Sequence, residues 1–440
     1  MKTNETNIKN SLLFPMLIAV LNLIPAGRMT AQPFTTLHGF TALGVYPYQT
    51  NSDGVTPYAG LITNSSGNTL YGTAAGGGSS GYGTVFAVST DGTGFTNLYS
   101  FTAGAASFPY TNSDGRNPQA ELILSGNTLF GTAAGGGSSG YGTVFAVNTN
   151  GTGFTNLHSF TRGSDGANPQ GLILSGNTLY GTASGGGSFD RGTVFALNTD
   201  GTGFTTLHSF TAIVDPYYTN SDGSNPYAGL ILSGNTLYGT AGQGGSSGAG
   251  AVFAVKTDGT GFTNLHSFTA TSGPFPSTNS DGANLDAGLI LSGNTLYGTA
   301  NYGGSSNRGT VFALNTDGTG FTTLHGFTGS GGAYPYAGLL LSGDTLYGTA
   351  AAGGSSGNGT VFSISFRPQL TISPSGTNVI LSWPISYAGF SYAGYTLQST
   401  TNLLSPSAWV TNSPVLVVIA GQNTVTNPIS TAQRYYRLVQ

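Results

Sequence analysis

The chain has 440 residues, of which only 6% are charged, and its formal net charge is −4. This balance excludes a nucleic-acid-binding protein, which would present a basic surface. The 72 glycines follow no three-residue period, which excludes collagen. Because cysteine is absent, disulfides, thiolate metal sites and a cysteine nucleophile are excluded too.

The first element in chain order is a predicted signal peptide over residues 1–31. Lys2 and Lys9 precede a short apolar run over residues 11–24, and small residues follow, with Ala31 as the expected cleavage position. The run is too short to span a bilayer. We therefore expect a secreted or cell-surface protein whose mature chain has no transmembrane segment.

Six copies of one block then follow. Each contains the phrase S-G-[ND]-T-L-[YF]-G-T and then G-T-V-F-A-[VL] or a close variant. The third position of the phrase falls at Asn68, Asn127, Asn177, Asn235, Asn294 and Asp344. Copies spaced 50–59 residues apart, with about four short strands each, are typical of a β-propeller. A parallel β-helix is the alternative, but its coils are shorter and lack these hairpins.

Alternation and turn residues predict the strands within a copy. In the third copy, the four predicted strands cover residues 171–175, 178–183, 192–198 and 204–211. Gly176-Asn177 is typical of a two-residue hairpin turn that requires positive φ. The first strand is expected to be innermost and the fourth outermost. The varied loops after the second and fourth strands then share one end of the propeller, the loop face, where we expect ligands to bind.

The ends of the repeat region predict how the ring closes. A lone F-T-T-L-H-G-F at residues 34–40 precedes the first copy, and the last copy stops after G-T-V-F-S-I-S-F at 359–366. We expect residues 34–41 to pair as the outermost strand beside 359–366, which removes two exposed sheet edges. The predicted fold is all-β: a six-bladed β-propeller over 32–366, with its last blade closed by the N-terminal strand, followed by a small β-sandwich over 367–440.

All five histidines occupy one position of the fourth strand. They are His38, His158, His208, His266 and His325, and Tyr99 takes this position in the remaining copy. We expect these side chains to be structural, with hydrogen bonds between blades. A metal site would require several of them to converge, whereas outermost strands spread them around the rim.

The candidate ligand contacts lie in loops between copies. They are the S-D-G aspartates Asp53, Asp114, Asp165, Asp222 and Asp281, with the aromatic residues Tyr46, Tyr110, Tyr217 and Tyr218. The alternative is that Asn and Asp beside Gly only form turns. Asn112, Asp114 and Asn117 space oxygen donors as a calcium loop does, although the bidentate Glu of such loops is missing. No other cofactor is expected.

No catalytic residue can be assigned from the sequence. Glu occurs only at Glu5 and Glu121, which weakens a glycosidase hypothesis based on paired carboxylates. No H-E-x-x-H motif exists, and no Ser-His-Asp set stands out.

The repeat ends at Arg367, and alternating strands continue to the C-terminus. The order of Leu381-Ser382-Trp383-Pro384, Gly394–Leu397, Trp409 and Tyr435–Leu438 resembles a fibronectin type III module. The resemblance implies a two-sheet sandwich with the first Trp and a late Tyr in its core.

The repeat itself resembles the GloVer repeats of secreted bacterial proteins. Its pattern is a Gly-Leu-Ile strand, G-N-L-Y-G-T, a G-G-x-x-G-x-G-T-V-F element and a terminal Leu-x-x-Phe. Here it is carried by Gly288–Ile290, Asn294–Thr299, Gly303–Phe312 and Leu324–Phe327. The resemblance implies an exported protein and supplies no catalytic residues.

We therefore expect a secreted or cell-surface, non-catalytic binding protein, with an extracellular polysaccharide or a surface protein as its partner. The alternatives are a hydrolase or lyase acting on extracellular polysaccharide and a structural surface-layer component. An enzyme would gather unlike polar residues from several blades at one point on the axis. A lectin-like protein would repeat one chemistry in each blade.

Overall fold

The computed structural model describes residues 35–45, 49–105, 107–273, 276–403, 409–411, 415–430 and 433–439. The predicted signal peptide, 1–31, lies outside these residues. The described chain is all β-structure and turns, and it contains no helix that is long and apolar enough to cross a membrane.

Five four-stranded antiparallel sheets follow one another along the chain, each in simple sequence order. The first holds β1 (Ile62–Thr63), β2 (Thr69–Ala74), β3 (Thr84–Ser89) and β4 (Thr96–Ser100). The second holds β5 (Ile123–Ser125), β6 (Thr128–Ala133), β7 (Thr143–Asn148) and β8 (Thr155–Ser159). The third holds β9 (Ala167–Ser175), β10 (Thr178–Gly185), β11 (Thr193–Asn198) and β12 (Thr205–Ser209). The fourth holds β13 (Ile231–Ser233), β14 (Thr236–Ala241), β15 (Ala251–Lys256) and β16 (Thr263–Ser267). The fifth holds β17 (Ile290–Ser292), β18 (Thr295–Ala300), β19 (Thr310–Asn315) and β20 (Thr322–Gly326).

The predicted strands are confirmed, and the repeated phrase explains their packing. In T-L-Y-G-T the glycine leaves room for the aromatic ring of the next strand. A Cβ built on Gly181 would lie 2.6 Å from Phe195 Cζ and 2.7 Å from Leu172 Cδ2. No larger side chain fits there without moving a buried phenylalanine, since Phe195 is fully buried.

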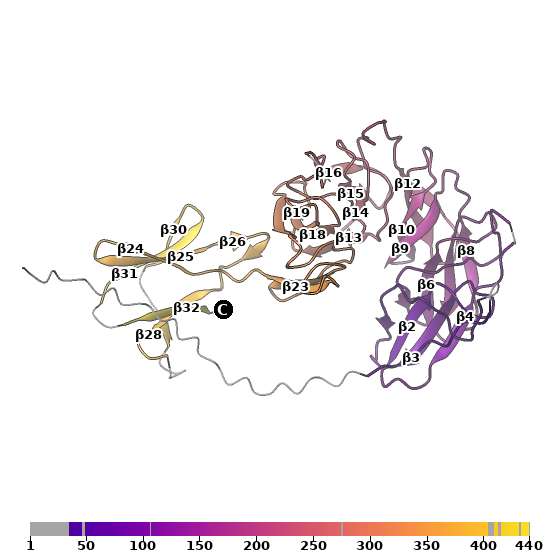
Figure 1. Cartoon of the computed structure of the whole chain (residues 1–440), viewed down its shortest axis with the longest axis horizontal. Helices are drawn as coiled ribbons and strands as arrows, with labels where there is room; N and C mark the ends of the chain where they lie inside the picture. The colour runs from indigo at the N-terminus through magenta and orange to yellow at the C-terminus, as the bar shows by residue number, and fades with distance from the viewer. Residues whose placement is uncertain are drawn as a thin grey trace, which may run out of the picture.

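Neighbouring sheets pack face to face around a curved body, as Figure 1 shows. In one core cluster, Tyr180 and Phe210 of the third sheet meet Leu237 and Phe253 of the fourth. Phe210 and Phe253 are fully buried. Burial of such side chains contributes roughly 1.5–3 kcal/mol each, so the contacts between sheets are the main source of stability.

The sixth sheet has three strands, β21 (Leu340–Ser342), β22 (Thr345–Ala350) and β23 (Thr360–Ser365). No described residue pairs with the outer edge of β23. Val361 is therefore 81% exposed, whereas its counterparts Val85 and Val311 are fully buried. Among the described residues, no strand pairing of the predicted kind joins 35–41 to β23. Residues 35–41 instead lie against the first sheet, and β23 stands apart from that sheet in Figure 1.

The C-terminal part is a two-sheet sandwich. One sheet orders β24 (Thr371–Ser375), β25 (Asn378–Pro384), β31 (Gln422–Pro428) and β30 (Val417–Ile419). The other orders β29 (Val410–Thr411), β28 (Thr396–Thr400) and β32 (Tyr435–Val439). Trp383 is 2% exposed in its core and Tyr436 packs against that core, which confirms the predicted places of both rings.

A hairpin of β26 (Ser386–Tyr387) and β27 (Phe390–Ser391) attaches this module to the repeat region. Phe390 stacks on Phe366 with ring centroids 4.3 Å apart. Asp344 pairs with Arg367 at 3.2 Å. The other five copies of the repeat have Asn at the position of Asp344, so this departure from the repeat belongs to the contact between the two parts.

Candidate functional site at the central hollow

The inner strands of the second to fifth sheets, with the residues just before them, line a cavity of about 850 Å³, which we call the central hollow. Its walls come from residues 119–124, 169–174, 227–231 and 286–289, with Tyr336 and Gly338 from the sixth repeat. The inner strands approach one another closely at a level occupied by glycine, namely Gly171, Gly229 and Gly288. A Cβ on Gly171 would lie 3.1 Å from Gly229 Cα, so a small residue is needed at this level.

Glu121 is the exception to that rule. It occupies the position that is Gly60, Gly171, Gly229, Gly288 and Gly338 in the other copies. Its carboxylate lies beside Gly60, where a Cβ would be 3.3 Å from Glu121 Oε1. The residue is exposed and lines the hollow. One carboxylate therefore projects from a wall that is otherwise glycine at this level.

A second carboxylate, Asp286, lines the hollow from the fifth repeat. The corresponding residues of other copies are Tyr58, Gln119, Tyr227 and Tyr336. Asn301 donates a hydrogen bond from Nδ2 to Asp286 Oδ2. Burial raises the pKa of Asp286 and outweighs the hydrogen bond, which acts in the opposite direction. Asn301 is fully buried, and its Oδ1 accepts no hydrogen bond from the described residues.

Tyrosines lie around Asp286. Tyr302 and Tyr336 share a hydroxyl–hydroxyl hydrogen bond of 3.1 Å. This bond, burial and the nearby charge of Asp286 raise the pKa of Tyr336 to about 12. Tyr227 and Tyr336 line the hollow and remain 40% and 46% exposed. No Lys or Arg is among the lining residues described.

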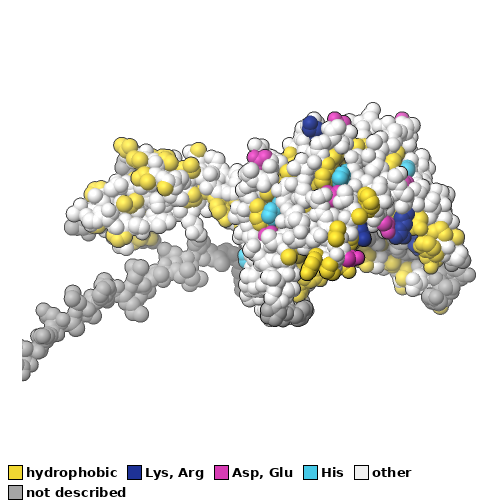
Figure 2. All heavy atoms as spheres, turned by 90° about the horizontal axis from the view of Figure 1, so that it is seen from above, with side chains coloured by type: hydrophobic (Ala, Val, Ile, Leu, Met, Phe, Trp, Pro, Cys, Tyr) yellow, Lys and Arg dark blue, Asp and Glu magenta, His cyan; other side chains and the backbone are white. Residues whose placement is uncertain are grey.

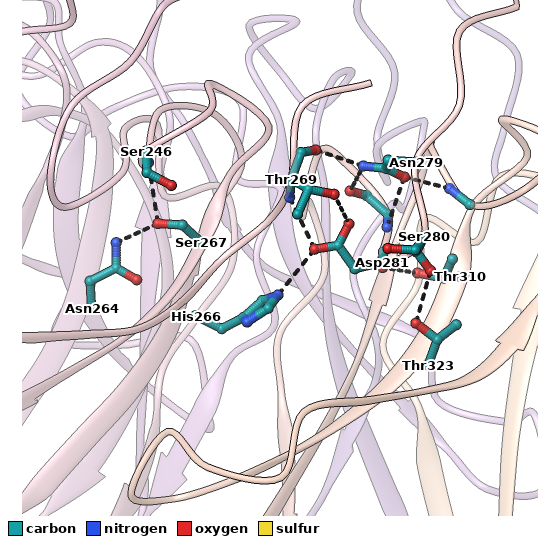
Figure 3. A network of polar contacts seen from close by, with 12 residues as sticks. Ser246, Asn264, His266, Ser267, Thr269, Asn279, Ser280, Asp281, Thr310 and Thr323 are labelled. Carbon is teal, nitrogen blue, oxygen red and sulfur yellow. Dashed lines mark hydrogen bonds and ion pairs between the residues drawn. The ribbon is translucent and has the colours of Figure 1, made fainter. Parts of the chain in front are cut away.

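The predicted S-D-G aspartates lie elsewhere, each in a network like that of Figure 3. Asp281 is 4% exposed. Its Oδ2 accepts hydrogen bonds from Thr269 N at 3.0 Å and lies 3.2 Å from His266 Nε2, and its Oδ1 accepts from Thr269 Oγ1. Burial would raise the pKa of Asp281, but the bonds from His266 and Thr269 prevail and lower it. The carboxylate therefore joins the loop to the outer strand.

The other copies repeat this network. Asp53, Asp165 and Asp222 bind His38, His158 and His208 at 2.9, 3.2 and 2.9 Å. In the second copy the Tyr99 hydroxyl donates to Asp114 at 2.7 Å. Because these carboxylates already accept hydrogen bonds within the chain, they hold the loops in place. Their contact with a ligand stays a prediction.

The histidines also connect neighbouring sheets. His266 stacks on Phe321 with centroids 3.8 Å apart, and His208 stacks on Phe262 at 3.6 Å. Figure 2 shows histidines spaced across one face, several of them beside an acidic side chain. No group of three or more metal-binding His, Asp or Glu residues occurs in the described parts of the chain. These contacts match the structural role expected of the histidines.

The side chains of the predicted calcium loop bind the backbone. Asn112 Oδ1 accepts hydrogen bonds from Gly115 N at 2.9 Å and Gly137 N at 2.8 Å. Asn117 Nδ2 donates to Ala75 O at 3.2 Å. Together with Asp114, which is held by Tyr99, these residues shape the loop. Calcium binding there stays a prediction.

The predicted tyrosine contacts are separate from the hollow. Tyr46 lies outside the described residues. Tyr217 and Tyr218 are 77% and 56% exposed in the loop after the third sheet. Tyr110 lies under Arg116, whose guanidinium carbon is 4.7 Å from the ring centroid. None of these three lines the hollow.

Sequence reasoning missed Glu121, Asp286, Asn301 and Tyr302 as members of one site. The available indicator was departure from the repeat. Aligned copies have glycine where Glu121 stands, and small residues in most copies where Asn301 and Tyr302 stand. Scaffold requirements act on every copy equally, so a polar residue present in one copy only is a candidate for a role beyond the scaffold.

Likeness to solved structures is slight. The Niastella koreensis GH74 enzyme is 15% identical, with a TM-score of 0.44 and coverage of 89% of this chain and 64% of that one. Oligogalacturonate lyase from Vibrio parahaemolyticus is 9% identical, with a TM-score of 0.44 and coverage of 70% and 77%. A chain of the nidogen/laminin complex is 15% identical, with a TM-score of 0.35 and coverage of 71% and 88%. Likenesses this weak carry no argument about function.

The comparison with protein-family models identifies the repeats. No curated protein matches the chain significantly. The model of the Gloeobacter/Verrucomicrobia repeat matches residues 29–221, 171–280 and 275–373, which together span most of the chain. With its repeated sheets and their shared phrase, the chain therefore belongs to the Gloeobacter/Verrucomicrobia repeat family.

Proposed function

We propose that this is a secreted or cell-surface, non-catalytic binding protein that holds an extracellular glycan in the central hollow. The observation that carries the proposal is the pair of half-exposed rings, Tyr227 and Tyr336, on the wall of an 850 Å³ cavity with polar side chains. Aromatic faces stack on sugar rings, while hydroxyl, amide and carboxyl groups orient the sugar hydroxyls.

The exposed loop tyrosines support a larger contact surface. Tyr217 and Tyr218 lie in a loop that leads toward Tyr227 at the wall of the hollow. A polysaccharide longer than the cavity would continue over this loop. The S-D-G aspartates then act indirectly, by fixing the loop positions. Replacing Asp222 by Asn tests that role.

The test is a glycan screen of the chain from residue 32 onward, with calcium or with a chelator. We expect Tyr227→Ala and Tyr336→Ala each to weaken binding about tenfold, or about 1.4 kcal/mol, because each removes an aromatic face on which a sugar ring can stack. Phe189→Ala is the matched control, because Phe189 is 52% exposed and does not line the hollow.

Three outcomes separate the hypotheses. Loss of binding in Tyr217→Ala/Tyr218→Ala alone would move the ligand out of the hollow and onto the loops. Binding that requires calcium would support the predicted calcium loop. Absence of binding to every glycan would refute the proposal and favour a structural surface-layer component.

An enzyme acting on extracellular polysaccharide is the second candidate. One observation favours it: Glu121 and Asp286, unlike residues from two repeats, line the same hollow. Glycosidases use two carboxylates, one of them with a raised pKa. Product release from a polysaccharide panel tests this candidate. Activity lost in both Glu121→Gln and Asp286→Asn would establish it over simple binding.

We also propose that the ring closes into six blades, with residues 35–41 as the outer strand of the sixth sheet. Two strand segments without a pairing partner fit each other. Residues 35–41 already make the contacts of an outer strand with the following sheet: His38 stacks on Phe95 at 3.5 Å, as His208 stacks on Phe262. They lack only a strand to pair with. β23 lacks only an outer partner.

The register of closure follows from the other sheets. Ala196 pairs with Thr205 in the third sheet and Ala87 with Thr96 in the first. Aligning the repeats places Ser363 opposite Thr35 in the same way. Closure would bury Val361 like its counterparts and remove an unpaired edge.

A further inference from the structure

The central hollow carries negative charge without a counter-charge. Glu121 and Asp286 come from the second and fifth repeats and line the same cavity. No Lys or Arg is among the described lining residues. Extending the proposed function, on which this inference rests, we infer that the hollow selects glycans that carry free, positively charged amino groups and rejects acidic polysaccharides.

The hydrogen-bonding groups of the hollow also favour ligands that carry amino groups. Among the described residues, neither the Glu121 carboxylate nor Asp286 Oδ1 accepts a hydrogen bond or forms an ion pair. This wall therefore presents acceptors that lack donors. An ammonium group has three donors and no acceptor, which makes it the complementary partner.

Electrostatics and the tyrosine faces add to this selectivity. A cavity with charge of one sign and partly apolar walls concentrates ligands of the opposite sign. Ammonium groups also interact favourably with aromatic faces, and Tyr227 and Tyr336 offer such faces. A uronate or sulfate group would instead bring like charge close to both carboxylates and gain no basic partner.

The scaffold does not need these carboxylates. Five copies of the repeat fold with glycine where Glu121 stands, and the aligned copies use Tyr or Gln where Asp286 stands. Holding the half-buried Asp286 carboxylate without an ion-pair partner costs solvation free energy. Isosteric replacement of the two carboxylates should therefore leave the fold intact and change only the ligand preference.

The experiment is calorimetric titration with three soluble probes. They are glucosamine oligomers, N-acetylglucosamine oligomers of the same length, and galacturonate oligomers. We expect the glucosamine oligomers to bind about tenfold or more tightly than their neutral counterparts, because a carboxylate–ammonium contact is the added interaction. Galacturonate oligomers should not bind measurably.

Glu121→Gln and Asp286→Asn should each reduce this preference several-fold, because each lowers the affinity for the glucosamine oligomers more than the affinity for the N-acetylated probe. Asp258→Asn is the matched control. It alters the net charge equally, but it lies in a turn where Asn150 of another copy makes the same bond to a threonine. It should leave the preference intact.

The results that would refute charge selectivity differ from those that would refute glycan binding. Equal affinity for the amino and N-acetylated oligomers, unaffected by either variant, would overturn the charge selectivity while glycan binding stands. Tighter binding of galacturonate would overturn it as well. If none of the oligomers binds, and the wider glycan screen is also negative, both the inference and the proposed function fall.

Discussion

Closure of the ring can be tested with an engineered disulfide, because the natural chain has no cysteine to interfere. The double variant Thr35→Cys/Ser363→Cys places thiols at positions that face each other if residues 35–41 pair with β23. The two positions are about 330 residues apart, for which the chain-entropy relation gives a stabilisation of up to about 6 kcal/mol.

The free energy that noncovalent contacts contribute to closure can also be estimated from the structure. Val361 would pass from 81% exposed to the full burial of its counterparts. Burying one such side chain contributes roughly 1.5–3 kcal/mol. Deleting residues 32–41 should therefore lower the melting temperature sharply, and an unchanged melting curve would contradict closure.

The assay compares migration in non-reducing gels and melting temperature with and without reductant. We expect a monomeric cross-linked species, more compact in denaturant, whose added stability disappears on reduction. Thr36→Cys/Ser363→Cys is the control, since shifting one thiol by a residue turns it to the opposite face. If the Thr35/Ser363 pair stays reduced, or cross-links only between molecules, the closure argument is wrong.

Two further predictions concern the loop networks. His208→Ala should lower the free energy of unfolding by about 1–3 kcal/mol, because Asp222 loses its imidazole partner. His208→Tyr should restore most of this stability, because Tyr99 fills the same role in the second copy. Loss of a stoichiometric metal on substitution would refute the structural role. Burial would raise the pKa of Asp165 and Asp281, but hydrogen bonds from His and Thr lower it below 3.8. Their contribution to stability is therefore present above that value and lost as the pH falls through the lower folded pKa. Denaturant midpoints should fall on acidification below about pH 4, and replacing both aspartates by Asn should flatten this dependence; an unchanged slope would show that these carboxylates do not contribute.

Much of the fold was predictable because its causes are local. The positive φ of Gly176 in the Gly176-Asn177 turn fixes a hairpin, and the alternation in T-V-F-A-L fixes which neighbouring sheet each side chain packs against. The role of the histidines followed from alternation too, since residues on one face of a strand meet the same neighbour. Their partners, the S-D-G aspartates, were instead predicted as ligand contacts. A turn-forming Asp and a ligand-binding Asp look identical until the loop's path is known.

The sequence by itself determined six repeated sheets, their strand order and a separate sandwich, because each hairpin is encoded within about twenty residues and recurs from copy to copy. Only the tertiary structure decided that Glu121 and Asp286 line one hollow. They are far apart in sequence and belong to different repeats, and they line one cavity because packing between sheets brings the inner strands together. Convergence depends on the sum of many buried contacts, such as Phe210 against Phe253, and no local pattern records it.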